Sequence, residues 1–286
     1  MNAPESDNPF APKQALKPTP ELYGELVGDG MEQLARASIS FIDLSSYSEI
    51  IVHDFGCGLG AATAAVVAAS NANNTKITGS DIDDNVLKLY REQISKNNWP
   101  AEAVKADAND LAFRDQSFTH TIGNALLFVL PNDGVDAVKE MHRTLKPDGV
   151  AIVNSWAYVP TLPAIVAACE KTRPAGTPLP RQGLEKWESE DFLRSIVIHG
   201  GFPAENVKLE RKDVFITIGN LKHFATMLWS FIGGTSSTGW LESDEDTWDV
   251  AVDTVVESLK KSEGFEELEN GKNKIMFKAH IAIARK

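Results

Sequence analysis

The stretch HDFGCGLG, residues 53–60, decides the fold of this chain. The preceding residues, Ile50, Ile51 and Val52, are apolar and β-branched, which predicts a buried parallel strand. The small residues that follow, 61–69, predict a helix that packs closely against a sheet. Glycines at alternate positions of the stretch permit a tight turn between strand and helix. Such a turn presents backbone N–H groups at a helix N-terminus, beside a polar ligand.

The glycine pattern alone is compatible with more than one class of cofactor-binding protein. Gly56 and Gly58 lack side chains that would block a ligand's approach to the backbone. Together with Ala61 they also fit the G-x-G-x-x-G/A fingerprint of nicotinamide and flavin enzymes. The rest of the chain has to distinguish these classes.

Composition narrows the classes of function. The chain has 286 residues, of which 43% are hydrophobic, enough for one large domain with an elaborated cap. Its net charge of -12 repels phosphate backbones, so we expect no nucleic-acid partner. Its two cysteines, Cys57 and Cys169, provide no disulfide framework, which suits a reducing cytoplasm. No apolar run approaches the ~20 residues of a membrane span, so we expect no membrane partner.

Strand and helix patterns alternate between residues 50 and 155, which predicts a parallel, doubly wound sheet. After the first strand, the expected strands are 76–81, 103–106, 118–126 and 150–155, and LKPDG at 145–149 has the composition of a turn. Ligands of such sheets bind at the carboxyl ends of the strands. Four polar residues lie at or near these ends and are expected at one edge: Asp54, Asp81, Asp107 and Asn124.

The pattern changes after residue 155. A β-branched strand is expected at 207–218 and a final strand at 274–285, separated by an insert, 219–261, that is rich in aromatic and acidic residues. Two strands joined by a long insert predict an antiparallel pair at one edge of the sheet. Such a pair distinguishes this chain from a dinucleotide-binding Rossmann domain.

Taken together, these features resemble the class I S-adenosylmethionine-dependent methyltransferases over roughly residues 45–218 and the last strand. The match consists of motifs in the right order: the glycine motif that begins at Asp54, the acid Asp81 within GSDI, Asp107-Ala108 with the DQSF that follows, the fourth strand ending at Asn124, and LKPDG. The resemblance implies a Rossmann-like, mostly parallel seven-stranded α/β sheet with an antiparallel last strand and a helical cap. It also implies S-adenosylmethionine as the cofactor. The sequence contains no evident metal site of two Asp and one Asn, so we expect no metal.

The resemblance assigns a role to each matched residue. Asp81 is expected to accept both ribose hydroxyls in charge-assisted hydrogen bonds, and Asp107 the adenine amino group, with the N–H of Ala108 near a ring nitrogen. The backbone of Gly56 and Gly58 is expected to approach the methionine part, and Asn124 to face its ammonium by backbone carbonyl, side chain or both. Asp54 is expected to orient the turn. The expected cofactor-binding set also contains Ile82 and Tyr23.

A second resemblance concerns the acceptor. SW at 155–156, the segment up to Pro180 and WESE at 187–190 resemble fungal secondary-metabolite methyltransferases, the gliotoxin thiomethyltransferase group among them. It implies a secondary metabolite as the acceptor and does not specify the acceptor atom, although S- or O-methylation is favoured. The aromatic, acidic-edged insert and Tyr23 favour a small, largely apolar molecule. The expected substrate-binding residues are Tyr23, Trp156 and Trp229. No catalytic residue is assigned, although His223 in the insert is the best candidate for a general base.

The expected organisation is a flexible tail, 1–20, followed by a single methyltransferase domain, 21–286, with cap elements 21–44, 157–186 and 219–261. Two other functions stay open. An NAD(P)-dependent oxidoreductase also carries an acid about 20 residues after its glycines, which Asp81 does not exclude. A non-catalytic protein could keep the fold and bind cofactor only to dock a partner.

Overall fold

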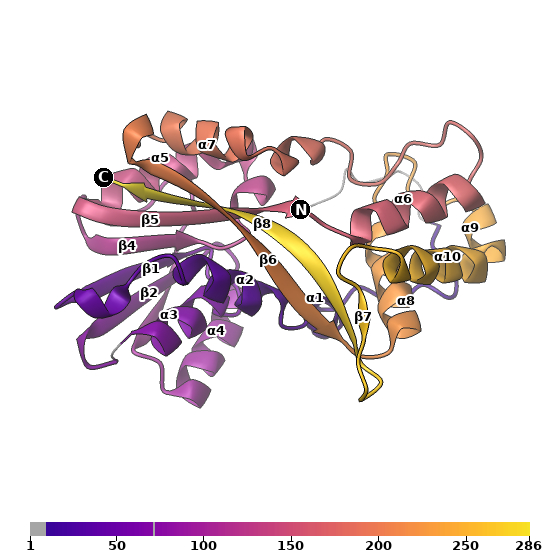
Figure 1. Cartoon of the computed structure of the whole chain (residues 1–286), viewed down its shortest axis with the longest axis horizontal. Helices are drawn as coiled ribbons and strands as arrows, with labels where there is room; N and C mark the ends of the chain where they lie inside the picture. The colour runs from indigo at the N-terminus through magenta and orange to yellow at the C-terminus, as the bar shows by residue number, and fades with distance from the viewer. Residues whose placement is uncertain (1–9, 71) are drawn as a thin grey trace. The chain divides into compact units, whose positions relative to one another are not determined.

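The computed structural model describes residues 10–70 and 72–286 (Figure 1). Its strands form one sheet in the order β3-β2-β1-β4-β5-β8-β6, and β7 pairs with β8 in antiparallel orientation. The pairs β1–β2, β1–β4, β2–β3 and β4–β5 are all parallel. This confirms the predicted doubly wound, mostly parallel sheet with an antiparallel last strand. The strands are β1 (Ile50–Phe55), β2 (Thr75–Asp81), β3 (Ala101–Lys105), β4 (Phe118–Gly123), β5 (Leu145–Tyr158), β6 (Val207–Ile218), β7 (Glu266–Glu267) and β8 (Asn273–Arg285).

Some helices connect the strands, and others, among them α6, α8 and α10, pack against one another. The helices α3 and α4 lie on one side of the sheet, and α5 and α7 lie on the other (Figure 1). The α-helices are α1 (Pro20–Val27), α2 (Gly30–Ile39), α3 (Ala61–Ala69), α4 (Asp84–Asn97), α5 (Val135–Thr144), α6 (Thr161–Thr172), α7 (Glu190–His199), α8 (Leu221–Ile232), α9 (Ser243–Asp246) and α10 (Trp248–Lys260).

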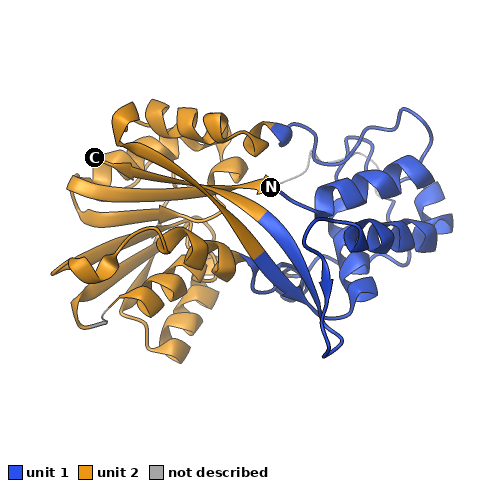
Figure 2. Cartoon of the chain, in the orientation of Figure 1, with its two compact units in different colours: residues 1–30, 158–185, 215–277 blue, residues 31–157, 186–214, 278–286 orange. Residues whose placement is uncertain are grey.

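The chain divides into two compact units, shown in different colours in Figure 2. Unit 1 contains residues up to Gly30, Tyr158–Glu185 and Phe215–Phe277, and unit 2 contains the remainder. The expected cap segments 157–186 and 219–261 fall almost wholly in unit 1. The segment 21–44 is divided, with α1 in unit 1 and α2, apart from its first residue Gly30, in unit 2.

Unit 2 is built on the parallel strands. Apolar side chains of β1, β4 and β5, such as Val52, Ile122 and Ile152, are at most 1% exposed and form its core. The turn predicted from the composition of LKPDG, residues 145–149, is wrong, because these residues belong to β5. The pairing register shifts between Phe118–Leu145 and His120–Val150, so residues 146–149 form an irregularity within the strand. β5 pairs with β4 both before and after these residues, so the sheet tolerates a segment whose composition is typical of a turn.

Unit 1 has a core of its own, which includes a buried ion pair. The guanidinium of Arg173 donates to the carboxylate of Asp244 through Nε (2.8 Å) and Nη2 (2.6 Å). It also lies over the rings of Trp229 and Trp240, 5.6 and 5.7 Å from their centroids. The Asp244 side chain also accepts from the backbone N–H of Leu241 at 2.8 Å. Since both charged side chains are at most 1% exposed, each compensates the desolvation of the other.

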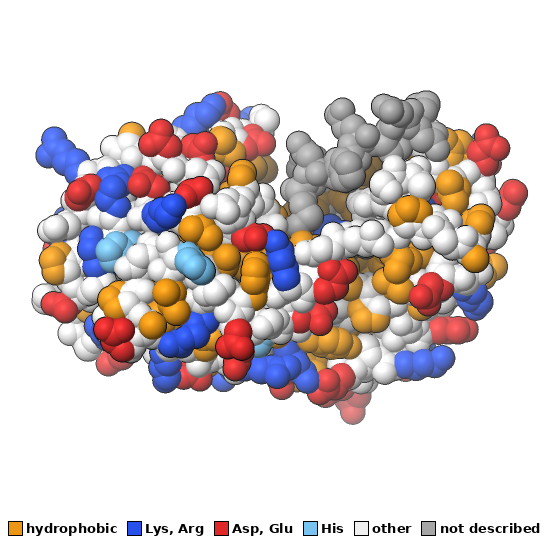
Figure 3. Space-filling model, turned by 90° about the horizontal axis from the view of Figure 1, so that it is seen from above, with side chains coloured by type: hydrophobic (Ala, Val, Ile, Leu, Met, Phe, Trp, Pro, Cys, Tyr) orange, Lys and Arg blue, Asp and Glu red, His pale blue; other side chains and the backbone are white. Residues whose placement is uncertain are grey.

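The expected tail is described only in part, because residues 1–9 lie outside the described residues. Between residues 10 and 19, Lys13 forms an ion pair with Glu245 (2.8 Å), and the N–H of Leu16 donates to Ser230 Oγ (3.1 Å). Both contacts lie within unit 1. Basic and acidic side chains are interspersed over the face seen in Figure 3. Among the described residues, no helix is both long and apolar enough to cross a membrane.

Candidate functional site

The glycine turn joins β1 to α3, and its glycines are needed for different reasons. Gly56 has φ 69°, and a Cβ added there would lie 2.6 Å from Cδ1 of Leu126. Gly58 has φ 52°, but a Cβ there would meet no described atom within 4 Å. A side chain at Gly56 would therefore have to displace the end of the Leu126 side chain, whereas Gly58 borders open space. Gly58 is the position at which a ligand can approach the backbone.

Asp54 connects the end of β1 to the helix that follows the glycine turn. Its Oδ2 accepts hydrogen bonds from the N–H (2.9 Å) and the hydroxyl (2.6 Å) of Thr63 in α3. The Thr63 hydroxyl also bonds to the hydroxyl of Tyr90, at 2.6 Å. Burial raises the pKa of Asp54 to about 7, although the two bonds from Thr63 oppose the rise and the charge of Asp81 adds to it. With a side chain that is 2% exposed, Asp54 contacts the helix rather than the open space.

Asp81 at the end of β2 is brought against the glycine turn. Its Oδ2 accepts from the N–H of Gly58 at 3.2 Å, and its Oδ1 accepts from the N–H of Asp83 at 3.1 Å. The N–H of Cys57 donates to the carbonyl of Ser80 at 2.8 Å, which ties the turn to β2 a second time. A carboxylate offers about four acceptor positions, so this partly exposed group has capacity left for ligand donors. The neighbouring Ile82 is 62% exposed.

Asp107 and Ala108 lie just past the end of β3. The N–H of Ala106 donates to the carbonyl of Asp81 at 3.1 Å, which places this segment beside the end of β2. The Asp107 carboxylate is exposed, and its Oδ1 accepts from the N–H (2.8 Å) and the side-chain amide (3.0 Å) of Asn109. Both bonds use the same carboxylate oxygen, as in an Asx turn. The loop geometry is thus fixed through one oxygen of the group.

Asn124 follows β4, and its side chain is part of a polar network. Its Nδ2 donates to the carbonyl of Met31 at 3.1 Å, and its Oδ1 accepts from Nδ2 of Asn154 at 2.9 Å. Asn154 also donates to Ser38 Oγ (2.8 Å), and its Oδ1 accepts from the N–H of Ala125 (2.7 Å). Both polar atoms of the Asn124 side chain thus have protein partners, and its backbone carbonyl offers a further acceptor that could face an ammonium. Sequence reasoning missed Asn154, a fully buried polar residue after the apolar run 150–153.

The candidate substrate residues have different surroundings. Tyr23 in α1 is 54% exposed, with its ring centroid 6.0 Å from that of Phe231, and Trp156 in β5 is partly buried. Trp229 in α8 is fully buried and packs against Trp240 in a T-shaped pair, 5.7 Å between centroids. Its position makes Trp229 a core residue of unit 1. The substrate-binding role of these three residues stays a prediction.

The candidate base His223 lies on the surface of unit 1. Its Nε2 is 3.0 Å from Oε1 of Glu25, and both side chains are about half exposed. A carboxylate partner orients an imidazole, although exposure of the pair gives it little electrostatic strength. Across residues 10–70 and 72–286, no group of three or more His, Cys, Asp and Glu side chains is placed to hold a metal ion.

Comparison with known proteins shows which domains this chain is similar to. Residues 52–149 match the family model described as a methyltransferase domain. This segment runs from β1 to the irregular stretch of β5, and thus contains the glycine turn, Asp81, Asp107 and Asn124.

Individual relatives agree with that class. The demethylmenaquinone methyltransferase of Staphylococcus carnosus (strain TM300) is 37% identical over 111 residues, which are 38% of this chain and 44% of that protein. The chain thus spans less than half the length of the curated relatives it matches.

Solved structures share the fold. The YcgJ protein from Bacillus subtilis has a TM-score of 0.53 at 14% identity, over 88% of this chain and 97% of that one. Phospholethanolamine N-methyltransferase 2 from Haemonchus contortus, solved with phosphomonomethylethanolamine and S-adenosylhomocysteine, has a TM-score of 0.53 at 14% identity, over 93% of this chain and 56% of that one. At these identities the likeness concerns the fold.

Proposed function

We propose that this chain transfers a methyl group from S-adenosylmethionine to a small, largely apolar molecule. One observation carries the proposal: the Asp81 carboxylate is bonded to the N–H of Gly58 where the glycine turn borders open space. An acid with remaining acceptor capacity beside an accessible backbone suits a ligand that combines a ribose with a polar chain. The methyltransferase-domain match over residues 52–149 supports the same assignment.

The residues present fit this cofactor. Asp81 would hold the ribose hydroxyls, and Asp107 with the N–H of Ala108 would hold the adenine, while Ile82 supplies an exposed apolar side chain next to Asp81. The backbone at Gly58 and the carbonyl of Asn124 would face the methionine part. When bound, the cofactor supplies a sulfonium methyl group that is already activated. The chain's own task is to align the acceptor with the methyl–sulfur bond and to exclude water.

The acceptor class rests on the sequence of the insert and on the second resemblance. An apolar acceptor whose thiol or hydroxyl receives the methyl group is our proposal, with a secondary metabolite as its chemical type. Because the curated relatives are named for demethylmenaquinone, that compound belongs in any panel of acceptors. An ionised thiol or phenol needs no base, so the proposal does not depend on His223.

Isothermal titration calorimetry of the full chain tests the proposed cofactor. We expect S-adenosylhomocysteine to bind with micromolar affinity and NAD to release no heat. Binding of NAD without binding of S-adenosylhomocysteine would contradict the proposal and favour the oxidoreductase interpretation. A Gly58→Ala variant tests the location with a smaller perturbation, because its Cβ would enter the space that the ligand needs. Its S-adenosylhomocysteine affinity should fall while its circular dichroism stays like that of the wild type.

A further inference from the structure

Unit 2 contains a cavity at the end of the parallel strands opposite the proposed cofactor residues. Its volume is about 440 Å³, and it is lined by residues of the segment 41–47, by Val150 in β5, by the start of β6 with the residues just before it, and by the end of β8. Val150 in its wall pairs with His120 near the start of β4, and residues 41–47 precede β1. The cavity therefore lies at the amino ends of the parallel strands, whereas Gly58, Asp81 and Asn124 follow their carboxyl ends.

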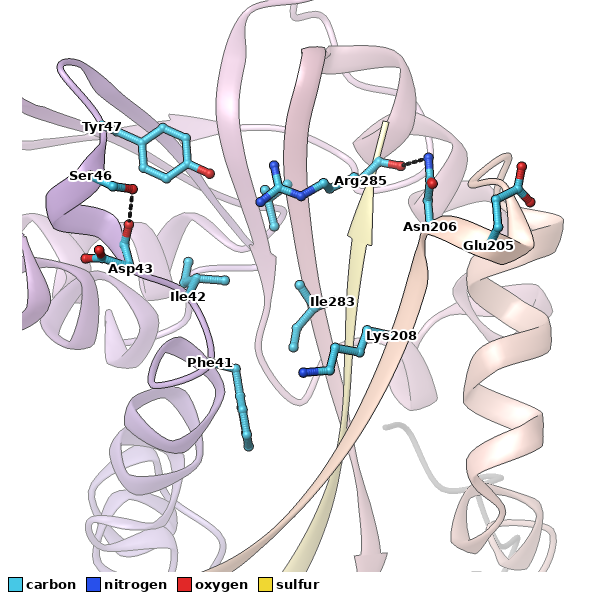
Figure 4. Close-up of a pocket in the computed structure, with 11 residues that line it drawn as sticks. Phe41, Ile42, Asp43, Ser46, Tyr47, Glu205, Asn206, Lys208, Ile283 and Arg285 are labelled. Carbon is cyan, nitrogen blue, oxygen red and sulfur yellow. Dashed lines mark hydrogen bonds between the residues drawn. The ribbon is translucent and has the colours of Figure 1, made fainter.

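Two cationic side chains extend into this cavity. Figure 4 shows the guanidinium of Arg285 and the ammonium of Lys208 directed from β8 and β6 toward the segment 41–47. Lys208 has a carboxylate partner, Glu210, at 2.5 Å. The guanidinium of Arg285 forms no ion pair or hydrogen bond with any residue among 10–70 and 72–286, and its backbone carbonyl accepts from Asn206 at 3.3 Å. Its full set of guanidinium donors is thus available to a ligand.

The positive charge of Arg285 affects the protonation of the nearby His120. The rings of His120 and Tyr47 form a T-shaped pair, with 4.6 Å between their centroids. Burial, and then the positive charge of Arg285, lower the pKa of His120 to about 4. The imidazole is therefore neutral near pH 7 and does not add to the positive charge of the cavity.

The remaining walls combine apolar surface with two acids. Phe41, Ile42, Val150 and Ile283 supply the apolar part. Asp43 and Glu205 supply carboxylates, and Oδ1 of Asp43 already accepts from the N–H and hydroxyl of Ser45 at 3.0 and 2.6 Å. These acids repel a dianion such as phosphate more strongly than a monoanion. The planar fork of an arginine matches a carboxylate in two parallel hydrogen bonds.

From this arrangement we infer that the cavity is a second ligand site, which binds a small organic monocarboxylate. The carboxylate is held by Arg285 with help from Lys208, and an aromatic or aliphatic body packs against Phe41, Ile42 and Ile283. The volume of about 440 Å³ is within the usual range of small-molecule sites, about 300–1,000 Å³. The site is independent of the methyl-transfer proposal, since it shares no residue with the cofactor edge.

Calorimetry with three probes tests the inference on the full chain saturated with S-adenosylhomocysteine. The probes are 2-naphthoate, its uncharged analogue 2-naphthamide, and inorganic phosphate. We expect 2-naphthoate to bind at least about tenfold more tightly than either other probe, since only it offers both a monoanion and an apolar body. If 2-naphthamide binds as tightly as 2-naphthoate, the charge of the ligand does not contribute to binding. If phosphate binds as tightly, the apolar wall does not contribute. Either result overturns the inference.

Matched variants locate the bound probe. Arg285→Gln should weaken 2-naphthoate binding by about tenfold or more, and Lys208→Gln by a smaller factor. Arg211→Gln is the control, because it removes the same charge from an exposed position on β6 at an odd offset from Lys208, hence on the other face of the strand. Unchanged affinity in both Arg285→Gln and Lys208→Gln, with circular dichroism like that of the wild type, places the probe elsewhere and refutes the assignment.

Discussion

Replacement of Asp81 by alanine is the sharpest test of the cofactor edge. The carboxylate accepts from the N–H groups of Gly58 (3.2 Å) and Asp83 (3.1 Å) and is proposed to accept from two ribose hydroxyls. A hydrogen bond to a charged group contributes about 1.5–3 kcal/mol, so S-adenosylhomocysteine affinity should fall about ten- to a hundredfold. Folding should survive at a cost of about 1 kcal/mol, because Gly58 is partly exposed and water can replace the lost acceptor.

The assay is isothermal titration calorimetry, paired with thermal unfolding of the same samples. Asp213→Ala provides the matched control, since it removes an exposed carboxylate from β6. Its affinity for S-adenosylhomocysteine should equal that of the wild type. If Asp81→Ala unfolds like the wild type and its dissociation constant is unchanged, the ribose binds elsewhere and the reasoning from the Asp81–Gly58 contact is refuted.

Three further predictions concern the turn, its buried acid and the core of unit 1. Gly56→Ala should lower the melting temperature more than Gly58→Ala, because both are strained at positive φ but only Gly56 meets a side chain at 2.6 Å; the reverse order in thermal unfolding would contradict this. The pKa of Asp54 is about 7 in the folded state, against an ordinary value of 3.8, so between these pH values the folded protein keeps a proton that the unfolded chain loses. The contribution of Asp54 to the free energy of unfolding therefore falls as the pH rises from about 4 to 7. In Asp54→Asn that fall should disappear from denaturant titrations across this range, and a profile parallel to the wild type would exclude Asp54 as its source. Arg173→Met should cost about 3–5 kcal/mol by leaving Asp244 buried without its partner, and adding Asp244→Leu should recover most of it in urea unfolding; an additive loss would show that charge pairing is not the cause.

The sequence predicted the parts of the fold that depend on local pattern. β6 spans the predicted residues 207–218, and β8 begins one residue before the predicted 274. Period-two and β-branched patterns determine such strands without reference to distant partners. The convergence of Asp81 with the glycine turn also followed from the sequence, because parallel strands end at one edge.

The parts that depend on distant partners could not be predicted. Nothing near Asn124 in the sequence indicates that its amide is bonded to Met31 and Asn154, which are 93 and 30 residues away. Gly56 was expected to make room for a ligand, yet its Cβ position is next to Leu126. Arg173 pairs with Asp244, 71 residues away, and lies over Trp229, which is buried in a core that composition alone could not distinguish from a binding wall. Tertiary packing decides these contacts, and single-sequence periodicity carries no information about them.

Transfer of an isotopically labelled methyl group tests the central claim most directly. The full chain is incubated with methyl-labelled S-adenosylmethionine and a panel of apolar thiols, phenols, amines and demethylmenaquinone, and the products are analysed by mass spectrometry. We expect a thiol or phenol product that carries the label, with turnover strongly reduced in Asp81→Ala at subsaturating cofactor. Tight S-adenosylhomocysteine binding with no labelled product from any acceptor of the panel would contradict the account and favour a non-catalytic cofactor-binding protein.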